Sequence, residues 1–167
     1  AGPLDESPQG GFFQALTKPG DRASALSQVF LGIRIDCAEC HHHPFDRWSQ
    51  EDYYGMTAFF AGVTPQKQSG TDVLVYDATA VTKHPITEQM VPPHPLGVSN
   101  FDVDQGADPR QALTTWLTSP DNRWFARSLA NRMWAHFFGR GLVEPIDDVR
   151  ETNPSVNDPL LSQLGEW

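Results

Sequence analysis

The stretch "IDCAECHHHPFDRW", residues 35–48, holds both cysteines of this 167-residue chain and three of its six histidines. These five side chains fall between positions 37 and 43. Thiolates and imidazoles are the side chains that bind iron and zinc and that carry disulfide chemistry. Three kinds of site are therefore considered for this stretch: a covalently attached haem, a zinc ion and a redox-active dithiol.

The spacing Cys37-Ala38-Glu39-Cys40-His41 is a CxxCH motif. On one helical turn, positions i, i+3 and i+4 project from the same face. Cys37 and Cys40 can then each form a thioether with one haem vinyl group, while His41 reaches the iron as the proximal ligand. The motif predicts one haem c, with His41 as a metal ligand.

The other sites explain the motif less completely. Zinc would use both cysteines and two of His41, His42 and His43, but structural zinc normally takes its second pair of ligands from a separate segment. A dithiol site would need a thioredoxin-like βαβ pattern, which the sequence lacks. A plain disulfide would leave the histidines unexplained. We favour haem, and these three alternatives stay open at this stage.

Hydrophobic periodicity predicts a mainly α fold. Fourteen prolines and thirteen glycines favour short helices joined by long loops, packed around one c-type haem. Helices are expected from Asp21 to about Gly32, after Ser49, from Asp108-Pro109, over 122–138 and from Asp158. In the helix over 122–138, we expect one apolar side, formed by Phe125, Leu129, Met133, Trp134 and Phe137. Within the Pro/Gly-rich residues 62–107, only "VLVYDATAV" (73–81) has strand character, which leaves room for a minor β hairpin.

The organisation expected along the chain has three parts. Residues 1–20 form an N-terminal arm, residues 21–107 a haem-binding domain with a long loop, and residues 108–167 a helical segment. The last segment looks like the truncated start of a second domain.

The net charge of −9 argues against a nucleic acid or an anionic membrane as partner, because both would repel the chain. No apolar run approaches the roughly 20 residues that span a bilayer. We expect a redox protein or a neighbouring haem subunit as partner, in a homo-oligomer or a larger complex.

Two segments carry a family resemblance. "FLGIRIDCAECHHHPFDRWSQEDYYGMTAFF" (30–60) resembles the signature of large exported cytochrome c-like proteins typical of planctomycetes, mostly of unknown function. "DPRQALTTWLTSPDNRWFARSLANRMWAHFFGRGLVEPIDDVRETNP" (108–154) resembles the domain that follows in the same proteins. The resemblance implies haem c, export to the periplasm or beyond, and an α-rich fold. Cys37, Cys40 and His41 match the positions of the attachment residues, whereas the resemblance implies no reaction.

The sixth position on the iron decides between electron transfer and chemistry. Met90, in the proline-stiffened "TEQMVPPHP" (87–95), is the tentative distal ligand, and His84 or His94 would give bis-histidine ligation instead. Equally, Met90 is explained as a loop residue packed on aromatic side chains.

Haem propionates need cationic or N–H donors. Arg34, Arg47 and Trp48 lie close enough along the sequence to supply them. Ordinary ion pairs of the arginines with nearby surface carboxylates are the alternative.

These features favour a single-haem electron carrier over a catalyst. The first alternative is a five-coordinate haem enzyme or a sensor of peroxide or gas. The second is a structural module in which haem serves as a core element. We therefore expect an electron-transfer protein more than an enzyme, and no residue of the sequence is assigned a catalytic role.

Overall fold

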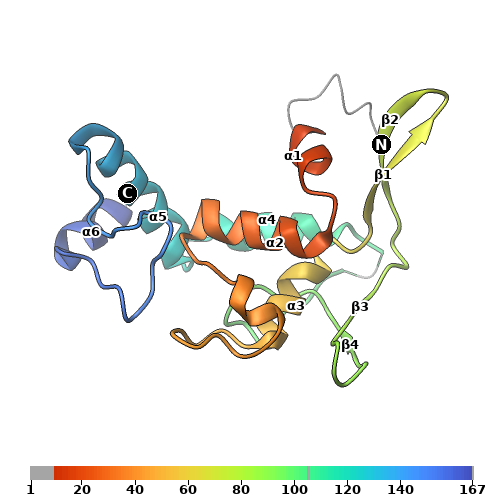
Figure 1. Cartoon of the computed structure of the whole chain (residues 1–167), viewed down its shortest axis with the longest axis horizontal. Helices are drawn as coiled ribbons and strands as arrows, with labels where there is room; N and C mark the ends of the chain where they lie inside the picture. The colour runs from red at the N-terminus through yellow and green to blue at the C-terminus, as the bar shows by residue number, and fades with distance from the viewer. Residues whose placement is uncertain (1–9, 105, 167) are drawn as a thin grey trace. The chain divides into compact units, whose positions relative to one another are not determined.

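A computed structural model describes residues 10–104 and 106–166. Among these residues the fold is rich in helices, with two small antiparallel strand pairs (Figure 1). The expected mainly α architecture with a minor hairpin is confirmed. The first nine residues of the expected N-terminal arm lie outside the described part of the chain.

The chain divides into two compact units that are not consecutive segments. One consists of residues 1–23 and 50–113, and we call it the hairpin unit; the other, residues 24–49 and 114–167, is called the motif unit. Two of the three boundaries fall inside helices, α2 (Pro19–Leu26) and α4 (Pro109–Leu117), and the third lies between residues 49 and 50. The CxxCH motif therefore belongs to the motif unit, whereas residues 84–94 belong to the hairpin unit.

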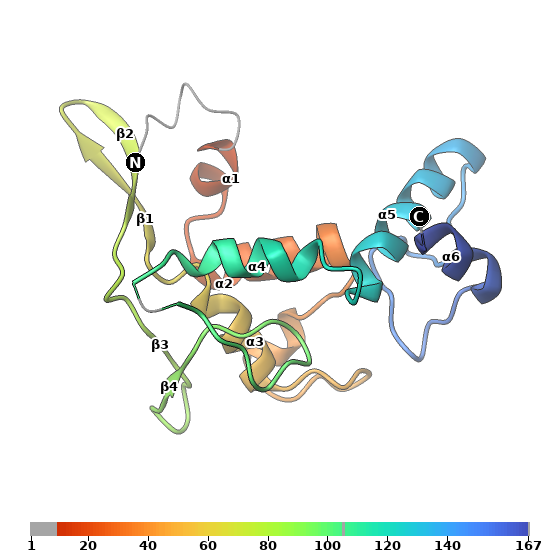
Figure 2. The same cartoon turned by 180° about the vertical axis from the view of Figure 1, so that it is seen from behind.

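In the hairpin unit, α1 (Gly10–Ala15) and α3 (Gln50–Ala58) accompany two ribbons of strands. Strands β1 (Val63–Gln68) and β2 (Thr71–Tyr76) pair antiparallel, and β3 (Thr82–Lys83) pairs with β4 (Met90–Val91) (Figure 2). Ser69 and Gly70 both have positive φ, at 51° and 88°. That backbone matches the right-handed twist of a two-residue hairpin turn. Strand β2 ends at Tyr76, so the expectation of strand character to residue 81 was too long.

A buried arginine organises the core of the hairpin unit. Arg22 is fully buried and donates to the carbonyl oxygens of Leu16 (2.7 Å), Thr17 (3.1 Å) and Val63 (2.5 Å). Burial, and secondarily the charge of Arg110, lowers the pKa of Arg22. Three carbonyl partners compensate for the lost hydration of the guanidinium. The apolar core around it includes Tyr53, Met56, Phe59, Phe60, Val63 and Leu96.

The motif unit is built on the helices α5 (Arg123–Phe138) and α6 (Asp158–Gly165), which lie side by side (Figure 2). Asn122 caps α5 by accepting hydrogen bonds from the backbone N–H groups of Trp124 (3.1 Å) and Phe125 (3.2 Å). Gly139 ends the helix at φ 74°, as the sequence predicts. The core joins Leu142, Val143 and Leu161 to the partly buried Ala130, Trp134, Val149 and Leu160.

The helix expected from Asp21 differs in detail. It begins at Pro19, and its last part is a wider π-helical turn, η1 (Ser27–Leu31). Gly32 ends it in the left-handed conformation, at φ 71°. Ile33 N–H bonds back to the carbonyl of Ser27 (3.1 Å), and Val149 N–H bonds to the carbonyl of Gly32 (2.7 Å). These bonds fix the start of the segment that leads to the motif.

None of the helices in the described ranges is both long and apolar enough to cross a membrane.

Candidate functional site

Cys37 lies on a tight 3-10 helix, η2 (Asp36–Glu39), and Cys40 directly follows its last residue, so the pair is not on the α-helical turn that we expected. A 3-10 helix has three residues per turn, so side chains at i and i+3 nearly eclipse each other. Cys37 and Cys40 are both exposed free thiols, while Ala38 between them is fully buried. The turn therefore anchors itself through Ala38 and presents its two thiols to the outside.

An alternating segment holds this turn in place. Ile33 and Ile35 are buried, whereas Arg34 between them is exposed. The amide of Ala38 then donates to the carbonyl of Ile35 at 2.8 Å, which closes the first turn of η2. Two buried isoleucines and one buried alanine thus fix a backbone whose reactive side chains stay accessible.

His41 follows the turn, and its ring nitrogens differ in role. Its Nδ1 lies 2.7 Å from the carbonyl oxygen of His42. Because a carbonyl oxygen only accepts, Nδ1 must carry the proton, and Nε2 of the neutral ring keeps its lone pair. A metal-binding histidine typically uses this arrangement, with one nitrogen fixed by a carbonyl and the other left for the metal.

His43 has the opposite arrangement. Its Nδ1 accepts a hydrogen bond from the amide of Phe45 at 3.3 Å, so the proton of the neutral ring lies on Nε2. The amide of His43 donates to the carbonyl of Trp48 at 2.8 Å and closes the loop that follows the motif. His43 therefore takes part in the loop, and its ring is poorly prepared to bind a metal.

Within residues 10–104 and 106–166, no group of three or more histidine, cysteine or acidic side chains gathers closely enough to hold a metal ion. A preformed tetrahedral zinc site of Cys37, Cys40 and two histidines is therefore not built in this part of the chain. Cys37 and Cys40 are both free in this structure and do not form a disulfide with each other.

Arg34 is engaged by a carboxylate distant in sequence. It forms an ion pair with Asp147, to which Gln28 also donates at 2.5 Å. Burial opposes the ionisation of Asp147, but the hydrogen bonds from Arg34 and Gln28 outweigh it and lower the pKa of Asp147. The hydrogen bond to Asp147 raises the pKa of Arg34. A propionate would have to share Arg34 with this pair.

Arg47 and Trp48 stand in an aromatic cluster. The guanidinium carbon of Arg47 lies 4.7 Å from the ring centre of Trp48 and 5.3 Å from that of Trp124. The rings of Trp48 and Trp124 meet edge to face at 5.9 Å, and Trp116 lies 6.5 Å from Trp124. Trp48 is only 3% exposed, and its Nε1 has no hydrogen-bond partner among the described residues. The indole N–H of Trp48 is thus buried without an acceptor, whereas Arg47 is exposed and forms no ion pair among the described residues.

The three distal candidates belong to the hairpin unit. Met90 lies on β4 and is 69% exposed, so its thioether is accessible and the packing of Met90 on aromatic side chains is not found. His94 is buried, its ring packs against Gly55, and its Nδ1 donates to the carbonyl of Pro92 at 3.0 Å. Its Nε2 keeps a lone pair, but ligation would require the ring to leave its buried position.

His84 differs from both. Its Nδ1 accepts from the amides of Ile86 (3.2 Å) and Thr87 (3.4 Å), which places the proton of the neutral ring on Nε2. Its ring also lies 5.7 Å from that of Tyr54. Of the three candidates, Met90 alone offers an exposed donor atom that no hydrogen bond or buried ring holds back.

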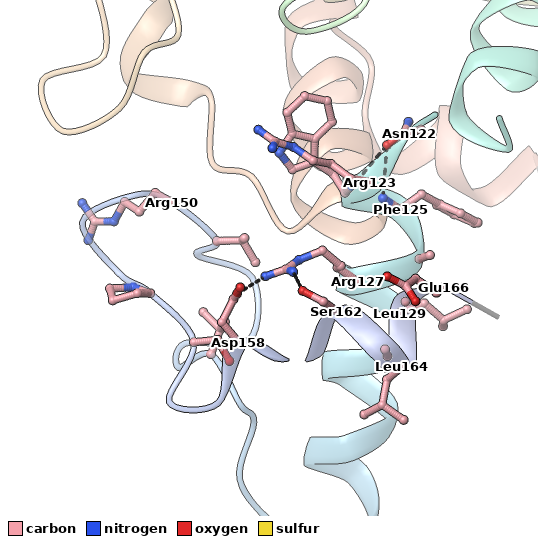
Figure 3. A pocket seen from close by; sticks show the side chains of 18 of the residues that line it. Asn122, Arg123, Phe125, Arg127, Leu129, Arg150, Asp158, Ser162, Leu164 and Glu166 are labelled. Carbon is pink, nitrogen blue, oxygen red and sulfur yellow. Dashed lines mark hydrogen bonds and ion pairs between the residues drawn. The ribbon is translucent and has the colours of Figure 1, made fainter. Parts of the chain in front are cut away.

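A pocket of about 1250 Å³ lies within the motif unit (Figure 3). Arg47 and Trp48 line it, together with residues of the first turns of α5 and of the segment 149–166. Cys37, Cys40 and His41 do not line this pocket. The sequence interpretation missed its other cationic and aromatic residues: Arg123, Trp124, Arg127 and Arg150. Only the neighbouring "NRWFAR" (122–127) hinted that arginine and tryptophan would stack there.

The sulfur and nitrogen atoms of this segment are of the kinds that a covalently attached haem needs. Two accessible thiols precede an imidazole whose Nε2 is free, and the guanidinium of Arg47 and the indole of Trp48 follow within eight residues of the motif.

Comparison with known proteins gives two family matches. Residues 9–65 match the family model PSCyt2, described as a protein of unknown function (DUF1549). Residues 109–166 match PSD1, likewise described as a protein of unknown function (DUF1553). No curated protein and no solved structure matches the chain. The chain is thus similar, over two successive segments that together make up well over half of it, to two families of unknown function typical of planctomycete-type proteins.

Proposed function

We propose that this chain carries one haem c and serves in electron transfer. The observation that carries the proposal is the geometry of His41, whose Nδ1–H is fixed on the carbonyl of His42 while Nε2 is left as a ligand. The exposed thiols of the adjoining 3-10 turn support it. In the bound state the haem would take up and release one electron.

The residues of the motif have separate tasks. Cys37 and Cys40 would hold a haem through thioethers, each thiol adding across one vinyl double bond so that sulfur bonds to one carbon and the thiol hydrogen goes to the other. His41 would bind the iron through Nε2. Arg47 and the N–H of Trp48 provide donors for the propionates, since neither is held by an ion pair among the described residues.

Met90 is the distal ligand that best fits this proposal. A thioether ligand raises the reduction potential relative to a second imidazole, which suits an electron carrier. We place this activity outside the cytoplasm, in the periplasm or beyond, with a redox protein or a neighbouring haem subunit as partner.

Optical spectra of exported, matured chain test the proposal. We expect a low-spin reduced spectrum that carbon monoxide leaves unchanged. The variant His41→Ala should lose this spectrum, whereas His42→Ala should keep it, because only the backbone carbonyl of His42 contacts His41. Equal spectra of His41→Ala and the unmodified chain would refute His41 as the ligand.

The variant Met90→Ala tests the assignment of Met90 as distal ligand independently of the haem attachment at Cys37, Cys40 and His41. Loss of the thioether should open the sixth position, so that the reduced protein becomes high-spin and binds carbon monoxide. A low-spin spectrum that survives in Met90→Ala would exclude Met90 and direct attention to His94. Carbon monoxide binding by the unmodified chain would instead favour the five-coordinate enzyme or sensor.

A further inference from the structure

The pocket of the motif unit is lined by both apolar and polar side chains (Figure 3). Phe125, Leu129, Val143, Val149 and Leu164 provide apolar surface. The polar side chains include the guanidinium groups described above, and all residues that line the pocket belong to the motif unit. A pocket of this composition fits a ligand with an apolar body and a polar end.

Two residues that line the pocket carry buried hydrogen-bond donors without partners. Nε1 of Trp48 is buried without a partner among the described residues, and so is Nε of Arg150. Indole and guanidinium nitrogens donate and never accept. Both nitrogens have almost no accessible surface, so an acceptor in the pocket does not reach them in this structure. Recognition of a ligand therefore depends on the donors that are exposed.

Two further guanidinium groups at the pocket are held by aromatic rings. Arg47 lies over Trp48 and Trp124, and the guanidinium carbon of Arg123 is 5.1 Å from the ring centre of Trp124. Neither arginine forms an ion pair with a carboxylate of the described residues. Their planar forks therefore remain free for a carboxylate, which they fit in two-bond geometry.

The carboxylates that line the pocket do not compete for these donors. Asp158 is paired with Arg127 at 2.5 Å (Figure 3), and Asp46 accepts from the backbone N–H of Arg47 at 2.8 Å. Glu151 and Glu166 are exposed, where water solvates them. The lining as a whole is balanced in charge, but its buried, unpaired groups are donors.

We propose that this pocket binds an amphipathic carboxylate. The apolar body of the ligand lies against Phe125 and Leu129, and its carboxylate accepts from the exposed guanidinium groups of Arg47 and Arg123, which both lie at the ring of Trp124. Two sources share this chemistry: the propionate edge of a haem attached at the motif, and a separate fatty or aromatic acid. The inference rests on the pocket and does not require that haem is attached.

Calorimetric titration of the full chain carrying Cys37→Ala and Cys40→Ala, which cannot attach haem, tests the site directly. Dodecanoate is the probe, and dodecanol is its uncharged counterpart. In this background, Arg47→Gln and Arg123→Gln each remove one of the unpaired positive charges at the pocket. Each should weaken dodecanoate binding by about tenfold or more and leave dodecanol unchanged.

Trp134→Phe and Arg140→Gln are the matched controls, since neither residue lines the pocket, and both should bind dodecanoate as the parent does. Absence of dodecanoate binding, equal binding of dodecanoate and dodecanol, or unchanged binding in Arg47→Gln would each overturn the inference. Arg47 and Arg123 are both exposed, so neither variant alters a buried side chain.

Matured, unmodified chain distinguishes the two sources. If the pocket receives the propionates, attached haem should exclude dodecanoate; if the ligand is a separate acid, dodecanoate should bind with and without haem. A chain that matures without haem and still binds dodecanoate would keep this inference and remove the proposed function.

Discussion

Among single residues, backbone groups decide which histidine nitrogens are available. Carbonyl oxygens fix the Nδ1 protons of His41 and His94, whereas backbone amides donate to Nδ1 of His43 and His84. The four rings have the same chemistry in the sequence, yet only the first two retain a free Nε2. These two histidines differ in solvent exposure, since His41 is exposed and His94 is buried in its unit.

The contact between His94 and Gly55 gives a prediction at this scale. A Cβ atom at position 55 would collide with the imidazole of His94, so Gly55→Ala should lower the free energy of unfolding by about 1–3 kcal/mol. Urea denaturation followed by tryptophan fluorescence measures the change. Gly11→Ala is the control without loss of stability, because nothing lies within 4 Å of its Cβ position.

The double variant Gly55→Ala/His94→Ala tests the cause. Truncation of the ring makes room for the added methyl group, so the double variant should be less destabilised than the sum of the single variants. Strict additivity would mean that the two residues are not in contact.

Among the elements, the sequence predicted most helix ends closely, but it did not predict which face of a helix is buried. The helix ends at Gly32 and Gly139 and a helix start near residue 122 were predicted, because capping depends on local chemistry, whereas the start expected at Asp21 lies at Pro19. The apolar side expected for α5 is exposed at Leu129, Met133 and Phe137, while its polar residues Ser128 and Asn131 are buried.

The burial of Asn131 explains why periodicity failed there. Its side chain donates to the carbonyl of Val143 (3.0 Å) and accepts from the amide of the same residue (2.9 Å). Asn131 therefore pairs the backbone N–H and carbonyl of Val143, which lies in an irregular segment without a helix or strand to pair them. Hydrophobic periodicity cannot show such a role, because it depends on a segment 12 residues further along the chain.

The cap of α5 gives a prediction for the element. Asn122→Ala removes the acceptor for the amides of Trp124 and Phe125, and the free energy of unfolding should fall by about 1 kcal/mol. Asn122→Asp keeps the acceptor and adds a charge that favours the helix N-terminus, so it should recover most of the loss. Urea midpoints of the three proteins make the comparison, and equal midpoints for the Ala and Asp variants would show that the cap contributes nothing.

For the whole molecule, the sequence led to the composition of the fold but not to its long-range partners. The residues of the CxxCH motif could be identified from the sequence, because the motif is defined by five consecutive positions. The alternative role given to Arg34 was an ion pair with a nearby carboxylate, yet its partner Asp147 lies 113 residues away. The interleaving of the two units has the same origin, since each unit is assembled from segments that the chain separates widely.

The Arg34–Asp147 pair predicts a dependence of stability on pH. The pKa of Asp147 is lowered in the folded state, so its contribution is present above the unfolded value of about 4 and is lost as pH falls through the folded pKa. The free energy of unfolding should therefore decrease below about pH 4, and less steeply in Asp147→Asn.

At neutral pH, Asp147→Asn should cost about 1 kcal/mol, since solvent screens the partly exposed Arg34. Urea unfolding at a series of pH values from neutral to acid measures both effects. Asp121→Asn, at an exposed position, should follow the unmodified chain. If both variants followed it, Asp147 would have no role in acid sensitivity.

The covalent bond between the cysteines of the motif and a haem is the central claim, and intact mass combined with a pyridine haemochrome spectrum tests it most directly. For exported, matured chain we predict the added mass of one haem that persists after denaturation, together with the spectrum of a porphyrin bound through two thioethers. Colourless protein in which Cys37 and Cys40 both react with an alkylating reagent would contradict the account.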